Sequence, residues 1–523
     1  MLFIVLCEDA KKRLFKKGKL MKKIISLILV LLILAIPLVS CKKGGEDSTS
    51  GSATNTATTT SDSAEVLPND NDDLPDDLNF GGKTYTIFSI AQTWAGGEFS
   101  QENEDNGNVV QQAVHLRNIN IQDRLNCKLA NFESLGNTNT DEMLTTIQNL
   151  VMGGMADYQL LVTAGYRMAP LASGGLLTDM RSLKYIDLNK DYYSQGYNSI
   201  LTVGDAQYLA TGTFTLGYYR YLMVNLFNKK TFRDRMIEEP YNLVREQKWT
   251  FEAMNNITKE LYYDVNGDGV KDKDDKYGYV IMTGNDSSFT DAFMSACDLR
   301  VMSKDDDNYY KVDINSEKYS DAVDTVLKLV FGEGTLSGSD LVATDVYSKF
   351  ADSSAAMITT RLYGVEDAEV IKLGNSDGYG ILPIPKMDEN QADYISYVQD
   401  QCFMFGIPSN LSGNTLTEVS QLFEAFASES YKTVKPAYYE KALTSRYAHD
   451  VDSVEMLDLI GKKVYVDPVN AYLLNGFVNT ATFRNIYATG INTISSQLAS
   501  AVGEGKLRTL VDELNEQYKR LVS

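Results

Sequence analysis

The stretch KTYTIFSI (Lys83–Ile90) alternates apolar and polar side chains and is rich in aromatic and β-branched residues, which predicts a strand. The following stretch, NVVQQAVHLRNINIQDRL (Asn108–Leu125), has apolar residues at helical spacing, which predicts a helix. The pattern then predicts a strand at CKLANF (127–132), a helix at TDEMLTTIQNLVMGG (140–154) and a strand at DYQLLVTA (157–164). This β-α-β-α-β order is typical of an α/β fold with a parallel sheet covered by helices.

The C-terminal end of the chain predicts a closing amphipathic helix. In GKLRTLVDELNEQYKRLV (505–522), one helical face collects the apolar side chains Leu507, Leu510, Val511, Leu514, Tyr518 and Leu521.

Residues Asp264 to Asp275 follow the pattern of a calcium-binding loop. Positions 1, 3, 5, 7, 9 and 12 of an EF-hand-type loop are taken by Asp264, Asn266, Asp268, Val270, Asp272 and Asp275, and Gly269 occupies the turning position 6. Five aspartates within twelve residues would repel one another without a cation. The sequence therefore predicts a structural Ca²⁺ ion, with an acidic turn between a helix and a strand as the alternative.

The N-terminal region predicts export and lipid attachment. Met21 is followed by two lysines and an apolar run, Ile24–Val39, which is typical of a signal peptide over residues 21–40. The sequence LVSC, ending at Cys41, resembles the lipobox of bacterial lipoproteins, in which the cysteine carries the lipid. A plain transmembrane anchor is the alternative, but the run is short and contains Pro37.

The segments on either side of the signal peptide have other interpretations. Residues 1–20 precede a complete signal peptide, so we interpret them as a mis-called N-terminal extension with the true start at Met21. Residues 41–78 are rich in Ser, Thr, Gly and Asp, which predicts a flexible tether.

Composition excludes several classes of function. The chain of 523 residues has 49 Lys and Arg against 70 Asp and Glu, and this excess negative charge disfavours nucleic-acid binding. Only two histidines, His115 and His449, are available for His-based zinc sites or a Ser/His triad. Cys127, Cys297 and Cys402 are widely spaced and odd in number, which favours buried free thiols.

Several segments, in order along the chain, resemble the family 1 extracellular solute-binding lipoproteins of bacterial ABC importers. In Lys248–Gly284 the residues WT open a predicted helix, and the calcium-loop pattern followed by YG closes the segment. The other similar segments are LRNINIQDRLN (116–126), SGGLLTDMRSLKYIDLNKDYY (173–193), MVNLFNKKTF (223–232), SKFADSSAAMITT (348–360), YGILPIPKMDENQADYI (379–395) and YYEKALTSRYAHDVDSVEMLDLI (438–460).

The resemblance implies a two-lobed, type II periplasmic-binding-protein fold with an interlobe cleft. It implies a first lobe of residues 79–222 with about 380–425, and a second lobe of 223–379 with about 426–523. It further implies a monomer on the extracellular face of the cytoplasmic membrane. Such a protein closes on a carbohydrate by hinge bending and delivers it, without catalysis, to an ABC permease.

Sugar recognition requires aromatic platforms and planar hydrogen-bonding groups, and ligands of α/β folds bind beyond the carboxyl ends of strands. Trp249 opens a predicted helix, so we expect it in the core. The expected ligand-binding residues follow predicted strands or approach the crossovers between lobes: Trp94, Glu98, Tyr166, Phe214, Tyr218, Arg361, Tyr363 and Asp400.

Two other functions remain open from the sequence. A cell-surface glycoside hydrolase needs only two carboxylates, and 70 acidic residues supply many pairs. A binder of a non-sugar solute such as a peptide would share the same fold. Hydrolysis products would identify the enzyme, whereas saturable binding without turnover would identify a carrier.

Overall fold

The computed structural model describes residues 71–90, 98–99, 109–134, 141–284, 288–376, 378–443, 451–472, 480–503 and 505–522. These residues all belong to one compact unit, Leu67–Ser523. The predicted extension 1–20, the signal peptide, Cys41, most of the tether and Trp94 lie outside the described residues. None of the helices among the described residues is long and apolar enough to span a bilayer.

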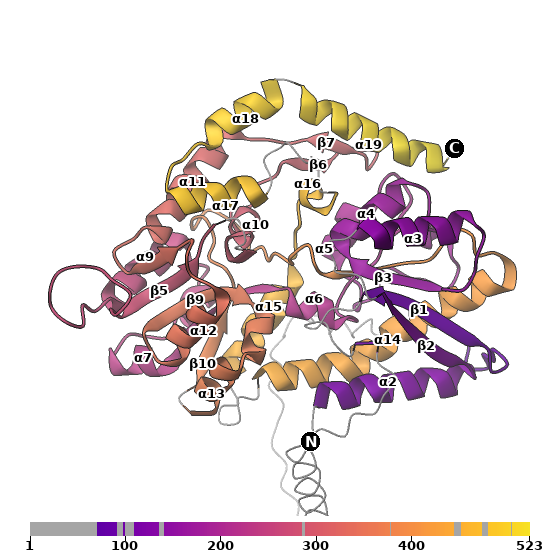
Figure 1. Cartoon of the computed structure of the whole chain (residues 1–523), viewed down its shortest axis with the longest axis horizontal. Coiled ribbons are helices and arrows are strands. Elements are labelled where there is room, and N and C mark those ends of the chain that lie inside the picture. The colour runs from indigo at the N-terminus through magenta and orange to yellow at the C-terminus, as the bar shows by residue number, and fades with distance from the viewer. Residues whose placement is uncertain are drawn as a thin grey trace, which may run out of the picture. The chain divides into compact units, whose positions relative to one another are not determined.

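The first sheet contains the predicted β-α-β-α-β unit. Within the described residues it has the strand order β11-β3-β1-β2, where β1, β2 and β3 are parallel and β11 is antiparallel to β3 (Figure 1). Its strands are β1 (Thr84–Ile90), β2 (Lys128–Ser134), β3 (Leu160–Ala164) and β11 (Phe403–Gly406). The helices in this part of the chain are α2 (Val109–Leu125), α3 (Asp141–Met152), α4 (Gly165–Ser173), α5 (Gln195–Leu201), α6 (Leu216–Arg220) and the 3₁₀ helix η1 (Met180–Ser182). The prediction of a parallel α/β unit is confirmed.

The second sheet is formed by the middle of the chain. Its order among the described residues is β10-β4-β9-β5-β8, with β5 parallel to β8 and β9 and the other pairs antiparallel. Its strands are β4 (Met223–Asn228), β5 (Tyr277–Met282), β8 (Thr335–Gly338), β9 (Ala355–Arg361) and β10 (Tyr379–Leu382). The accompanying helices are α7 (Lys229–Asp234), α8 (Tyr241–Arg245), α9 (Phe251–Leu261), η2 (Ser288–Thr290), α10 (Ala292–Ala296), α11 (Ser316–Val330), α12 (Ala343–Ala351), η3 (Leu362–Glu366) and α13 (Ala368–Ser376).

The last part of the chain is helical, and its helices pack against elements that accompany the first sheet and against the second sheet itself. Helix α14 (Gly413–Leu443) packs on α2, and α15 (Val451–Lys462) packs on β10. The remaining helices are α16 (Pro468–Ala471), α17 (Thr480–Thr489), α18 (Ile494–Gly503) and α19 (Lys506–Val522). Strand β10 pairs with β4 in the second sheet, although the sequence assigned residues from about 380 to the first lobe, and α14 runs unbroken through residue 425. The lobe boundaries stay a prediction.

The buried side chains follow the sequence prediction closely. Trp249 is fully buried, and its ring N–H donates to the carbonyl oxygen of Pro383 at 2.9 Å. Cys127, Cys297 and Cys402 are buried free thiols. The prediction of a core tryptophan and of unpaired cysteines is confirmed.

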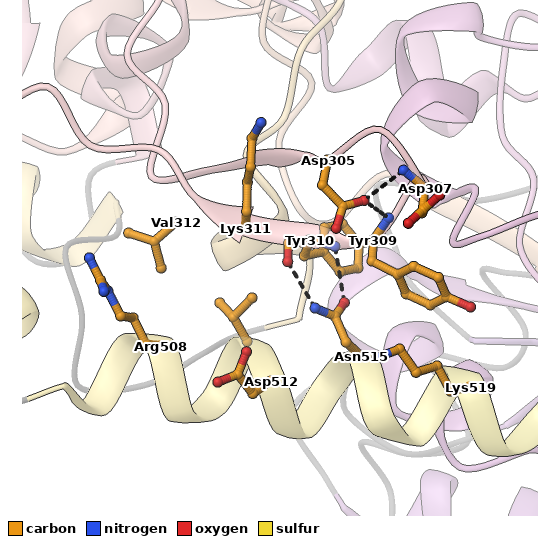
Figure 2. Close-up of a pocket in the computed structure, with 11 residues that line it drawn as sticks. Asp305, Asp307, Tyr309, Tyr310, Lys311, Val312, Arg508, Asp512, Asn515 and Lys519 are labelled. Carbon is orange, nitrogen blue, oxygen red and sulfur yellow. Dashed lines mark hydrogen bonds between the residues drawn. The ribbon is translucent and has the colours of Figure 1, made fainter.

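A small hairpin, β6 (Met302–Lys304) and β7 (Tyr310–Val312), is held by α19. Asn515 accepts a hydrogen bond from the Tyr310 N–H at 3.0 Å and donates to the Tyr310 carbonyl at 2.8 Å (Figure 2). On its other side, Lys304 donates to the carbonyl of Thr202 at 2.7 Å. The predicted C-terminal helix therefore clamps a hairpin that also contacts the segment after α5.

Two of the segments that connect the sheets pair with each other. Tyr221–Met223 links α6 to β4, and Tyr397–Gln399 lies on the way from β10 to β11. The Met223 N–H donates to the Tyr397 carbonyl, and the Gln399 N–H donates to the Tyr221 carbonyl, both at 3.0 Å. These two segments form a short antiparallel ribbon between the sheets.

A third segment joins this ribbon along its other edge. The Ser396 N–H donates to the Lys463 carbonyl at 2.8 Å, and the Tyr465 N–H donates to the Ser396 carbonyl at 2.9 Å. Lys463–Tyr465 connects α15, which packs on β10, to α16, which contacts α4. We refer to Tyr221–Met223, Ser396–Gln399 and Lys463–Tyr465 as the crossing segments.

Candidate functional site

Four charged side chains interact beside the crossing segments, and each comes from a different part of the chain. Asp291 directly precedes α10, Arg361 ends β9, Asp400 precedes β11, and Arg484 lies in α17. Their charges influence one another, since Arg484, Arg361 and Asp400 all act on the Asp291 carboxylate. We refer to these four residues as the charged cluster.

The Asp291–Arg484 ion pair is the most buried part of the charged cluster. The Nε atom of Arg484 donates to Asp291 Oδ1 at 2.6 Å, and its Nη2 atom bonds the other carboxylate oxygen. The Asp291 side chain is 1% exposed and that of Arg484 is 19% exposed. Burial raises the pKa of Asp291 to about 6, although the Arg484 guanidinium opposes the shift.

Asp400 links the charged cluster to the first sheet. A Cβ atom added at Gly165, the first residue of α4, would lie only 3.4 Å from the Asp400 carbonyl oxygen. The Gly165 N–H also donates to the Cys402 carbonyl at 3.0 Å. Burial raises the pKa of Asp400, and the Arg484 and Arg361 guanidinium groups counteract this effect. The charged cluster is therefore built by elements of both sheets.

Arg361 retains unused hydrogen-bonding capacity. Its Nε atom is buried and has no hydrogen-bond partner among the described residues, and the same holds for Oε1 of Gln399 in the crossing segments. Buried polar atoms without partners cost free energy. A solute with hydroxyl groups can supply the missing partners at this place.

Two predicted aromatic residues follow strands that end near the charged cluster. Tyr363 lies in η3 directly after β9 and is partly exposed, with the Arg220 guanidinium 5.8 Å from its ring centroid. Tyr166 lies in α4 directly after β3, with Arg167 5.1 Å from its ring centroid. Arg361 and Tyr363 both influence the phenol of Tyr221, whose pKa burial raises. Arg361 therefore acts on the Asp400 carboxylate, and Arg361 and Tyr363 both lie near Tyr221 of the crossing segments.

Three other predicted site residues lie in the interior around α6. Glu98 is buried and accepts the N–H groups of Leu216 at 2.8 Å and Gly217 at 3.3 Å. Phe214 packs against other aromatic rings, including Phe405 at 5.0 Å between centroids. Tyr218 is buried, and its hydroxyl lies 3.0 Å from Ser194 Oγ. As placed, these side chains position α6, which leads into the first crossing segment.

Asp291 and Arg484 were not among the binding residues predicted from the sequence. Asp291 follows β5, so the rule that directs attention to the carboxyl ends of strands could have found it. Arg484 lies within a helix near the end of the chain, and no local pattern marks it.

The predicted calcium loop is a turn held by its own hydrogen bonds. Asp264 accepts the N–H groups of Gly267 at 2.7 Å and Gly269 at 2.8 Å, and Gly269 has the positive φ of 75° that its turning position requires. Asp268 accepts the Val270 N–H at 2.7 Å. The first half of the turn therefore fits the loop pattern.

The second half of this loop fits the calcium-loop pattern less well than the first half. Asp275 is buried and accepts bonds from Tyr262 Oη at 2.8 Å, the Val265 N–H at 3.1 Å and the Asp272 N–H at 3.3 Å. Across the part of the chain that the structure describes, no group of three or more His, Cys, Asp or Glu is arranged to hold a metal ion. Calcium binding by Asp264, Asn266, Asp268, Val270, Asp272 and Asp275 stays a prediction.

Chelation tests the calcium prediction directly. A site with a Kd on the order of 10⁻⁴–10⁻³ M stabilises the fold by about 1 kcal/mol at millimolar calcium. We expect EDTA to lower the melting temperature by a few degrees, and Asp264→Ala combined with Asp268→Ala to remove that sensitivity. A melting curve of the intact protein that does not respond to EDTA would contradict a structural ion.

The two sheets, the crossing segments between them and the charged cluster beside those segments define a class of architecture. It is the two-lobed α/β fold of type II periplasmic binding proteins, as the resemblance implied. No protein-family model matches the sequence, and no curated protein is similar enough to be a relative.

Solved structures share this fold at low sequence identity. A sugar transporter from Rhizobium etli in an open conformation has 15% identity and a TM-score of 0.52, over 83% of this chain and 99% of that one. A cyclo/maltodextrin-binding protein complexed with maltotetraose has 17% identity and a TM-score of 0.52, over 81% and 97%. UgpB from Mycobacterium tuberculosis, in complex with glycerophosphocholine, has 13% identity and a TM-score of 0.50, over 85% and 100%.

Proposed function

We propose that this chain is an extracellular solute-binding protein that captures a carbohydrate between its two lobes and delivers it unaltered to an ABC permease. The observation that carries this proposal is the charged cluster. It is assembled from elements of both sheets, directly beside the segments that connect them.

The crossing segments suit a hinge. They are short extended segments joined side by side by backbone hydrogen bonds, so bending them changes the angle between the sheets without unpairing either sheet. A solute that contacts Arg361 and Arg484 from one lobe and Asp400 beside α4 of the other makes more contacts in the closed form. Such a solute selects the closed form by its differential affinity.

The chemistry of the charged cluster favours a polyhydroxylated solute. Arg361 and Asp400 offer planar donor and acceptor groups, and the partly exposed Tyr363 adds an aromatic ring two residues after Arg361. The sugar transporter and the maltodextrin-binding protein with the same fold support carbohydrate as the class of solute. The glycerophosphocholine complex of UgpB makes a non-sugar solute the alternative to test.

Calorimetric titration with neutral mono- and oligosaccharides, including maltotetraose, and with glycerophosphocholine tests this proposal. We expect saturable binding of a saccharide, which chromatography then recovers intact. Release of shorter sugars would identify a glycoside hydrolase instead, and binding of glycerophosphocholine alone would identify a non-sugar carrier.

Membrane attachment is proposed from the sequence of the leader. The apolar run Ile24–Val39 and Cys41 support export followed by lipidation, and each buried CH₂ of an acyl chain contributes about 0.8 kcal/mol to membrane binding. We expect Cys41→Ser to abolish incorporation of radiolabelled palmitate and to move the protein from the membrane fraction to the medium. Unchanged labelling would exclude Cys41 as the lipidated residue.

A further inference from the structure

A cavity that is separate from the charged cluster lies among α5, α6, α14 and α15. Its volume is about 490 Å³, within the range of roughly 300–1,000 Å³ that is typical of small-ligand sites. Helices α5 and α6 precede the first crossing segment, and α15 directly precedes the third. The cavity is therefore bounded by elements on both sides of the connection between the sheets.

One wall of the cavity is an aromatic face of α14. Tyr431, Lys435 and Tyr439 are spaced four residues apart, so they lie on the same side of the helix. Both tyrosines are partly exposed. Their rings offer flat apolar surfaces, which match the C–H faces of a sugar ring.

The floor of the cavity is formed by polar groups in fixed positions. The hydroxyl groups of Ser194 and Tyr218 lie 3.0 Å apart, and the Tyr193 hydroxyl donates to Glu424 at 2.7 Å. Gly196 packs so closely that an added Cβ atom would lie 1.9 Å from the Val464 carbonyl oxygen. This floor is pre-formed, so a ligand does not have to order it.

The charged groups of the cavity favour a neutral ligand. Asp191 and Asp458 carry two negative charges, and Lys435 and Lys462 carry two positive charges, so the lining is neutral overall. The Lys435 Nζ atom lies 4.0 Å from the Tyr431 ring centroid and 5.7 Å from that of Tyr439. This ammonium group places a positive charge close to both rings and so repels a cationic ligand there.

We propose that this cavity is a second carbohydrate site, which takes a short neutral saccharide against Tyr431 and Tyr439. The ammonium and carboxylate groups at its rim bind the saccharide hydroxyls. Its lining residues differ from those of the charged cluster, so substitutions can separate the two sites.

Titration of the full chain carrying Arg361→Ala tests this site, because that substitution weakens binding at the charged cluster. The probes are maltose and maltotetraose, followed by calorimetry and saturation-transfer NMR. We expect a saturable component that Tyr431→Ala weakens about tenfold, the effect of losing one aromatic contact surface. Asp458→Asn, at the exposed rim, should weaken the same component without affecting the fold.

Tyr263→Ala is the matched control, since Tyr263 is 49% exposed and does not line the cavity. It should leave the component unchanged. The proposed second site would be overturned if no saturable component were observed, if neither Tyr431→Ala nor Asp458→Asn weakened it, or if choline displaced the saccharide. Solute capture at the charged cluster is tested separately by comparing saccharide binding to the unsubstituted chain and to the Arg361→Ala variant. If Arg361→Ala does not weaken that binding, the proposal of solute capture at the charged cluster fails.

Discussion

Replacing Arg361 with alanine is expected to weaken solute binding roughly ten- to a hundredfold. Hydrogen bonds to charged groups contribute about 1.5–3 kcal/mol, and the buried Nε atom of Arg361 has no partner of its own among the described residues. The solute is therefore expected to supply that partner. Calorimetric titration with the saccharide that binds the unsubstituted protein measures the loss.

Asp400→Asn should weaken binding in the same direction, because it removes the carboxylate on the side of the first sheet. Lys273→Ala is the control, since Lys273 lies on the surface in an ion pair with Asp340. All three variants should keep the melting temperature of the parent within a few degrees. Unchanged affinity in both Arg361→Ala and Asp400→Asn would remove the charged cluster from the binding site.

Replacing Asp291 with alanine is expected to cost the fold about 3 kcal/mol. Asp291 is almost completely buried against Arg484, and removing one partner of a buried pair leaves an uncompensated charge. Chemical denaturation of the variant and the parent measures the difference in the free energy of unfolding.

The double replacement Asp291→Ala with Arg484→Ala should cost less than the sum of the single replacements, because it removes both charges. Asp340→Ala breaks the surface pair with Lys273 and should leave the denaturation midpoint nearly unchanged. Equal effects of Asp291→Ala and Asp340→Ala would show that the buried pair does not hold α17 against α10.

The sequence was sufficient to predict the parallel part of the first sheet because the order of its elements is local. The strands β1, β2 and β3 and the helices between them follow one another without interruption, and each shows its own periodicity. Strand β11 pairs with β3, which lies more than 200 residues earlier in the sequence. No local sequence pattern predicts such a pairing. The same reason explains why the pairing of β10 with β4 was not predicted.

The candidate site was predictable only in part. Arg361, Tyr363 and Asp400 could be selected because they follow strands or crossovers, where ligands of α/β folds bind. Glu98 and Phe214 met the same criterion, but the fold buries them around α6. Arg484 lies in the charged cluster because α17, from the C-terminal part of the chain, packs close to Asp291. No local sequence pattern predicts such a long-range contact for a residue inside a helix.

A measurement of the distance between the lobes tests hinge closure on a carbohydrate most directly. Spin labels can be placed at Met152, the last residue of the first-sheet helix α3, which is 79% exposed, and at Met236, which follows α7 and is 93% exposed. Cys7 and Cys41 are replaced by serine, and the other cysteines are buried. We predict that a saturating saccharide moves the distance distribution to a new and narrower maximum, and that Arg361→Ala shifts this response to higher saccharide concentration. A distance distribution that stays unchanged while calorimetry records saturable saccharide binding would contradict hinge closure.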